Sequence, residues 1–325
     1  MTLESTPAPA FRAPWWLRGP HAQTVYGSLA APAPQVRLRR ERWDTPDGDF
    51  VDLDFVDGPD GAPWLHLFHG LEGSSRSPYA RALMAMAARR GWRGSVLHFR
   101  GCSGEINRLP RAYHSGDTNE IDWVLRRLRA GVGEAPLYAV GISLGGNALA
   151  KWLGESGEDA RRTVARAATV CAPFDLMAAG EALGRGFGLV YAHHFLGTLR
   201  KTALAKLEQH PGLFDAGAVR RARTLRDFDN VVTAPLHGFR DTDDYWTRAS
   251  AKPWLKAIAV PTLLVNARDD PFLPESALPT EREVSPAVKL EFPREGGHVG
   301  FVSGPFPGNI DWLPRRIFQF LEQPE

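Results

Sequence analysis

Residues 137–149 read LYAVGISLGGNAL and place a single serine, Ser143, between glycines. Gly141, Ser143 and Gly145 match G-x-S-x-G where an apolar strand pattern passes into a helical one. Small residues two positions before and after the serine permit a sharp turn that exposes its hydroxyl. The pattern predicts a nucleophilic serine; a glycine-rich helix start that packs closely on a strand, or binds phosphate, is the alternative.

A serine nucleophile needs a general base and a carboxylate that orients this base. The chain order serine, acid, histidine indicates His298, in the loop PREGGHVGF after the last predicted strand. Asp269 and Asp270 follow the strand pattern TLLVN. The two side chains would point in different directions, so only one of them can serve the histidine. We expect Asp270 to be the acid, because its position directly before Pro271 resembles the D-P-x-x-P form that is common after this strand. Asp269 is the alternative. In the non-catalytic interpretation, both aspartates only cap the next turn.

Acyl transfer also needs donors for the oxyanion. The segment FHGLEG at residues 68–73 ends an apolar strand in the position of an HG-type oxyanion motif. We therefore predict the backbone N–H groups of Leu71 and Leu144 as the donors. His69 is expected to brace this loop rather than to act as a second base.

These residues require a sheet that brings strand ends together. Apolar strands alternate with helical patterns over residues 37–173 and 254–325, which predicts one α/β core: a mostly parallel central sheet with helices on both faces. Residues 174–253 interrupt the alternation and are predicted to form a mostly helical cap with an apolar inner face. Residues 1–36, rich in proline and aromatic residues, are predicted to be an extended N-terminal arm.

Composition excludes several classes of protein. The 325 residues include 39 basic and 37 acidic side chains, so the net charge of +2 offers no case for nucleic-acid binding. Cys102 and Cys171 form no CxxC pair, and neither a signal-peptide pattern nor an apolar run of about 18 residues is present. We expect a cytoplasmic protein without a transmembrane segment. The carboxylates of RDTDDYW (residues 240–246) are expected to be solvated, because the calcium-loop glycine is missing, and no metal is predicted.

The segments HLFHGLEGSSRSPYARAL, HFRGCSGE with the following YHSGDT, VGISLGGNALAKWLGE and LLVNARDDPFLP resemble the YheT-like esterases of the α/β-hydrolase superfamily (AB hydrolase-4 type). The resemblance runs from about Pro14 to the C-terminus. It implies a Ser-Asp-His triad on Ser143, Asp270 and His298 and an ester hydrolase that needs no cofactor. Eukaryotic relatives act on medium-chain or oxidised phospholipids and acylglycerols.

The function predicted is a serine hydrolase that cleaves carboxylic esters, of short- to medium-chain acyl groups or lipids, through an acyl-enzyme intermediate. Its partner would be a small-molecule substrate. The same triad serves amidases and C–C hydrolases, and a non-catalytic relative that only binds a ligand is a further alternative. Asp117 and Glu120 are expected to form a capping box for the helix that starts at TNEIDWVL, without a catalytic role.

Overall fold

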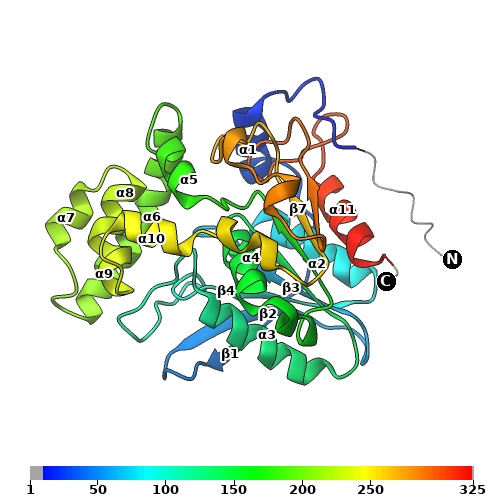
Figure 1. Cartoon of the computed structure of the whole chain (residues 1–325), viewed down its shortest axis with the longest axis horizontal. Helices are drawn as coiled ribbons and strands as arrows, with labels where there is room; N and C mark the ends of the chain where they lie inside the picture. Colours follow the sequence, from blue (N-terminus) through cyan, green and yellow to red (C-terminus); the bar gives the residue numbers. More distant parts are fainter. Residues whose placement is uncertain (1–9, 324–325) are drawn as a thin grey trace.

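The computed structural model describes residues 10–323, which fold around one eight-stranded sheet (Figure 1). The spatial order of the strands is β1-β2-β4-β3-β5-β6-β7-β8. The strands are β1 (Arg39–Asp44), β2 (Phe50–Val56), β3 (Trp64–Phe68), β4 (Arg93–His98), β5 (Leu137–Ile142), β6 (Arg166–Val170), β7 (Thr262–Val265) and β8 (Val288–Glu291).

Strands β1, β2 and β4 pair antiparallel, whereas every pair from β4 across to β8 is parallel. The mostly parallel sheet predicted from the alternating patterns is therefore confirmed. Parallel strands require crossovers, and helices supply them here. Ligands of such sheets bind beyond the carboxyl ends of the strands, and that is where the loops after β3, β5, β7 and β8 lie.

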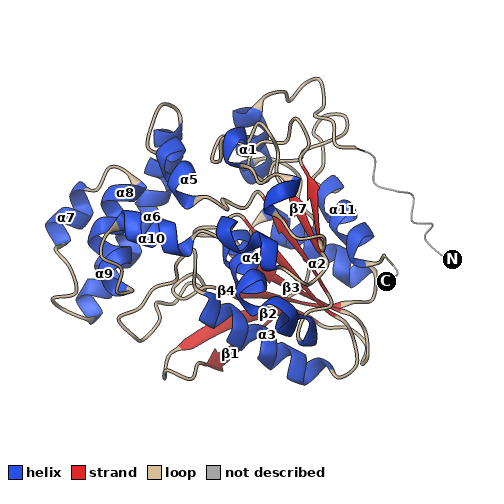
Figure 2. Ribbon diagram, in the orientation of Figure 1, coloured by secondary structure: helices blue, strands red, loops and turns tan. Residues whose placement is uncertain are grey.

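Helices cover both faces of the sheet (Figure 2). On one face, α3 (Thr118–Val132) and α4 (Leu144–Ser156) bury Val124, Leu125 and Trp152 against the strands. On the other face, α2 (Pro78–Arg89) and α11 (Trp312–Leu321) bury Leu83, Ile317 and Phe318. Both faces of the sheet are thus packed, as parallel sheets require.

Between β6 and β7 the described chain forms helices and no strand. These are α5 (Leu176–Leu183), α6 (Gly188–Gln209), α7 (Ala216–Arg221), α8 (Leu225–Phe228), η2 (Asp229–Thr233), α9 (Ala234–Leu236), α10 (Thr242–Ala249) and η3 (Lys252–Ala257). Helices α5 and α6 are separated by a short turn in which Gly186 adopts a positive φ of 53°. Figure 1 shows most of this insertion standing beside the sheet.

Short 3₁₀ helices occur elsewhere, at η1 (Gly157–Arg162), η4 (Glu275–Ala277) and η5 (Glu281–Glu283). The N-terminal arm is not extended throughout: it contains helix α1 (Pro20–Leu29), whose residues Gln23 and Gly27 are buried. Residues 1–9 of the arm lie outside the described residues. Among residues 10–323 there is no helix with the length and apolar character needed to cross a membrane.

Candidate active site

Ser143 occupies a sharp turn between β5 and α4. Its φ of 51° is unusual for a residue with a side chain, and its N–H donates to the carbonyl of Val170 at 2.8 Å. The flanking glycines are required by space: a Cβ on Gly141 would lie 2.5 Å from the Gly145 carbonyl oxygen, and one on Gly145 would lie 2.5 Å from that of Phe68. The G-x-S-x-G pattern is thus a steric requirement of this turn.

Three side chains that are far apart in the sequence form one chain of hydrogen bonds. His298 Nδ1 lies 2.9 and 3.1 Å from the two carboxylate oxygens of Asp270, and His298 Nε2 lies 2.9 Å from Ser143 Oγ. Because a carboxylate only accepts, Nδ1–H donates to Asp270. A neutral imidazole then presents its bare Nε2 to the hydroxyl of Ser143, as a general base must.

The adjacent aspartates have different partners. Asp270 contacts His298 and also accepts the backbone N–H of Phe272 at 2.8 Å, while the Phe272 ring stacks on the imidazole with 3.9 Å between ring centroids. Asp269 instead accepts the N–H of Gly297 at 2.9 Å, and burial raises its pKa. The structure therefore places Asp269 as a support for the histidine loop, without contact to the imidazole.

Helix α1 completes that loop. Thr24 Oγ1 accepts the backbone N–H of His298 at 2.8 Å. Gly297, with a φ of 59°, lies so close to α1 that a Cβ would be 2.5 Å from the Pro20 carbonyl oxygen. The glycines before His298 thus permit close packing as well as a turn. No local sequence signal marks Thr24, since its partner is 274 residues away.

The loop after β3 offers a free backbone donor to the site. The N–H of Gly70 donates to the hydroxyl of Tyr79 at 3.0 Å, and the N–H of Glu72 donates to that of Tyr113 at 2.9 Å. Between them, the N–H of Leu71 has no hydrogen-bond partner in the described part of the chain. A Cβ on Gly70 would lie 3.1 Å from Ser143 Cβ, so this loop passes directly beside the serine.

Leu144 supplies the second predicted donor. It is the first residue of α4, directly after Ser143, where the backbone N–H has no acceptor within the helix. The positive end of the helix dipole lies at the same place and favours negative charge. The donors predicted from the sequence, Leu71 and Leu144, thus lie beside the serine, one in the loop after β3 and the other at the start of α4.

His69 does not face this site. Its Nε2 accepts the N–H of Phe99 at 3.1 Å, so Nδ1–H donates to the Gly70 carbonyl at 2.7 Å. The ring is fully buried, which lowers its pKa to about 3. A histidine that stays neutral and spans two loops is a structural brace, as the sequence analysis predicted.

Two cavities meet at Ser143 and His298. The inner lobe, about 160 Å³, lies between the sheet and the helical insertion. Apolar side chains of the insertion, contributed by several of its helices, line it: Leu176, Ala179, Leu183, Leu199, Leu225 and Val232. The outer lobe, about 470 Å³, lies between α1 and the start of α6. Leu71, Phe195 and Phe272 border both lobes, so the serine faces two separate binding spaces.

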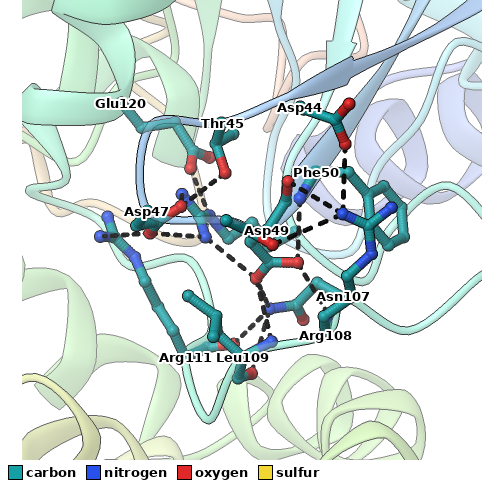
Figure 3. Close-up of polar contacts among 12 residues, drawn as sticks. Asp44, Thr45, Asp47, Asp49, Phe50, Asn107, Arg108, Leu109, Arg111 and Glu120 are labelled. Atoms are coloured by element: carbon teal, nitrogen blue, oxygen red, sulfur yellow. Dashed lines mark hydrogen bonds and ion pairs between the residues drawn. The ribbon is translucent and has the colours of Figure 1, made fainter.

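A buried ion network supports the wall of the inner lobe (Figure 3). Arg100 donates to Glu120 at 2.5 Å and to Asp49 at 3.0 Å, and Arg111 pairs with Asp117 at 2.7 Å. These ion pairs correct the predicted capping box, because the N-cap Asp117 makes no side-chain bond to α3. The carboxylates of Asp117 and Glu120, which the sequence pattern assigned to the start of the helix, bind Arg111 and Arg100 instead.

The same wall is fastened to the helical insertion. Lys206 on α6 donates to the carbonyls of Asn107 and Leu109, at 2.5 and 2.9 Å, and burial lowers its pKa to about 8. Asn107 in turn donates to Asp49 at 2.6 Å. The inner lobe is therefore bounded by a polar frame behind an apolar lining.

No separate metal site appears among the described residues. The one cluster of three potential ligands is Cys171, Asp270 and His298, of which the latter two are already bonded to each other. Asp241, expected to be solvated, caps α10 by accepting the N–H of Asp244 at 2.8 Å, and Asp243 pairs with Arg226. Both cysteines are free thiols.

Comparisons with known proteins agree with this architecture. The model of the alpha/beta hydrolase fold family matches residues 63–305. The chain is 42% identical to "Putative esterase YheT" of Escherichia coli (strain K12), over 93% of this chain and 89% of that protein. It is 31% identical to "Phospholipase ABHD3" of Mus musculus, over 95% of this chain and 76% of that protein.

A solved structure with a similar fold is the esterase PF2001 of Pyrococcus furiosus. Its TM-score is 0.57, with 15% sequence identity over 98% of this chain and 97% of that chain. At this identity the likeness shows the fold alone. The family match and the similarity to YheT go further: the chain belongs to the α/β-hydrolase family, in the group that includes YheT.

Proposed function

We propose that the protein is a serine hydrolase of carboxylic esters, with Ser143 as nucleophile, His298 as general base and Asp270 as the acid that orients it. The observation that carries the proposal is the hydrogen-bond chain from Ser143 through His298 to Asp270. Similarity to an esterase and to a phospholipase, as those relatives are named, supports esters as the substrate class.

The reaction follows from the positions of these groups. His298 Nε2 takes the proton of Ser143 as Oγ attacks the ester carbonyl, and Asp270 stabilises the imidazolium that forms. The N–H groups of Leu71 and Leu144 donate to the oxyanion. His298 then protonates the leaving alcohol, and a water molecule, activated by the same imidazole, releases the acid from Ser143.

The two lobes suggest how an ester is held. The inner lobe is bounded by leucines of the insertion and takes the acyl chain, since burial of each methylene stabilises binding by roughly 0.8 kcal/mol. The outer lobe is larger and takes the alcohol part of the ester. We therefore propose medium-chain acyl esters as preferred substrates.

We also propose that the protein is located in the cytoplasm. The free thiols of Cys102 and Cys171 support a reducing compartment.

The test combines turnover with covalent labelling. Purified protein is assayed on p-nitrophenyl esters from acetate to palmitate, on the matching anilides and on phospholipids, and a fluorophosphonate is used to label the nucleophile. We expect ester turnover, with the adduct on Ser143 alone. Ser143→Ala should lose several orders of magnitude in kcat, because triad members act as a unit. Retention of more than about a tenth of kcat would reject Ser143 as the nucleophile.

The same assay separates the alternatives. Turnover of the anilides at a rate comparable to the esters would assign an amidase. A ligand-binding protein would show neither turnover nor a phosphonate adduct. Thermal unfolding of Ser143→Ala serves as the control, since the smaller side chain fits the turn and the fold should be retained.

A further inference from the structure

Large apolar side chains that are exposed to solvent gather in one region of the described surface. The residues of this kind are Trp15, Val25, Leu29, Phe187, Leu189, Val190, Trp254 and Phe306. All of them except Trp254 belong to three stretches, 10–36, 182–207 and 296–310. Single exposed apolar residues are ordinary, but such a concentration marks an interaction surface.

Several of these exposed apolar residues lie at the outer lobe. Leu29 on α1 and Val190 on α6 line this lobe, yet their side chains are 77% and 56% exposed. His21 joins the two helices by stacking on Phe187, with 4.2 Å between ring centroids. We define the apolar rim as Trp15, Val25, Leu29, Phe187, Leu189, Val190 and Phe306. Four of these residues, Val25, Leu29, Phe187 and Val190, line the outer lobe, which reaches Ser143. Phe306 adjoins them through Trp16, whose ring contacts both Phe306 and Tyr26 of α1.

The charged residues within the three stretches are basic. No Asp or Glu falls within 10–36, 182–207 or 296–310, although Glu181, Glu208, Glu295 and Asp311 directly flank the latter two. Arg18 and Arg185 are exposed next to the rim and have no ion pair among the described residues. The carboxylate that lines the outer lobe, Glu72, accepts the hydroxyl of Tyr113. A surface that is apolar at its centre and carries exposed arginines without ion pairs beside it is complementary to anionic lipid.

We propose that the apolar rim docks the protein on a lipid bilayer that contains anionic phospholipid. Aromatic side chains such as Trp15 and Phe306 are suited to the level of the headgroups, and Leu29, Leu189 and Val190 to the region just below it. The arginines provide attraction to the surface. In this orientation the outer lobe opens toward the bilayer, so an ester could pass from the membrane to Ser143 without crossing water.

The proposal is tested by vesicle sedimentation with the Ser143→Ala protein, so that binding is read without turnover. Vesicles of phosphatidylcholine alone are compared with vesicles that also contain phosphatidylglycerol, at low and at high salt. We expect binding to the anionic vesicles that weakens with salt. Replacement of Trp15, Leu189 and Phe306 by Glu together should weaken it by about tenfold or more.

These three residues line neither lobe, so the same triple substitution, made in the protein that retains Ser143, should leave hydrolysis of a water-soluble short ester unchanged. Trp254→Glu is the matched control, an exposed tryptophan away from the rim, and should bind vesicles as the parent does. Absence of vesicle binding, or equal binding by the triple variant, would overturn the proposal. So would a dimer in solution that the triple variant abolishes, because the rim would then be an interface between copies. None of these results depends on whether Ser143 is catalytic.

Discussion

The hydroxyl of Tyr113 donates to Oε1 of Glu72 at 2.7 Å and accepts the backbone N–H of the same residue at 2.9 Å. Glu72 has a φ of 54°, a conformation that a residue with a side chain adopts only where its surroundings enforce it. Tyr113 supplies that enforcement, and it is itself fixed by stacking on Phe99, with 5.2 Å between ring centroids. Tyr113 therefore helps to fix the direction of the neighbouring Leu71 N–H, together with Tyr79, which accepts the N–H of Gly70 on the other side.

We predict that Tyr113→Phe lowers kcat for ester hydrolysis by about tenfold and leaves KM nearly unchanged, because a displaced donor weakens transition-state binding more than substrate binding. Steady-state kinetics on a soluble ester measure both constants. Tyr138→Phe is the control, since Tyr138 stacks on Trp92 away from the site. An equal loss in both variants, or a rise in KM alone, would contradict a positioning role for Tyr113.

The paired aspartates give a matched comparison. Asp270→Asn should reduce kcat by about a thousandfold or more, because an amide holds the wrong imidazole tautomer and cannot stabilise its charged form. Asp269→Asn should cost far less, because its amide oxygen can still accept the N–H of Gly297. Kinetics of both variants with one ester decide the matter. The reverse order of effects would assign the acid to Asp269.

The inner lobe predicts a preference for acyl chain length. In the p-nitrophenyl series kcat/KM should rise by about fourfold per methylene until the lobe is filled, and then fall. Leu199→Trp should move the maximum to shorter chains, because Leu199 lines the lobe, whereas Leu189→Trp on the same helix should not. A profile that falls steadily from acetate would reject the inner lobe as the acyl site.

Asp229 predicts a pH dependence of stability. Burial raises its pKa from 3.8 to about 6, although its oxygens accept from Thr233 at 2.5 Å and from Trp246 at 2.9 Å. The folded state therefore binds more protons than the unfolded state between these two values. The free energy of unfolding must fall as the pH rises through that window and stay lower above it.

Asp229→Asn should remove this decrease in the free energy of unfolding, because an amide does not ionise. At about pH 8 the variant should be more stable than the parent by on the order of 2 kcal/mol, and the difference should shrink at about pH 4. Chemical unfolding at both pH values measures it. Asp243→Asn, at an exposed position, is the control. A variant that is less stable than the parent at the higher pH would show that the Asp229 carboxylate contributes favourably in its charged form.

The sequence predicts well what depends on near neighbours. The strand-to-helix turn at Ser143 is prescribed by Gly141 and Gly145, and the alternation of strands and helices prescribes the sheet. Asp117 and Glu120 show the limit of local patterns. Their spacing suits a capping box, but Arg111 and Arg100 approach from outside α3, and a guanidinium–carboxylate pair carries charge on both partners whereas a capped backbone N–H carries none.

Other parts of the site depend on contacts that no local pattern carries. Thr24 reaches the histidine loop, and Tyr113 the loop after β3, from elements that are remote in the chain. Phe272 lies only two residues after Asp270, but no pattern indicates that its ring stacks on His298. Helix α1 was not predicted from the sequence for a similar reason. Its residues read as a proline-rich extended arm, but packing of Gln23 against Val302, with a hydrogen bond of 2.8 Å, stabilises the helix.

The bond between Thr24 and His298 has a consequence for biosynthesis. Helix α1 is synthesised well before the loop that it shapes, because Thr24 and His298 are 274 residues apart in the chain. Until that loop is synthesised, Gln23 and Thr24 lack their partners, and the histidine has no fixed position over the serine. The nascent chain can thus complete β5 and its serine turn long before the hydrogen bond between Ser143 and His298 can form. That bond requires α1 and the histidine loop to have met.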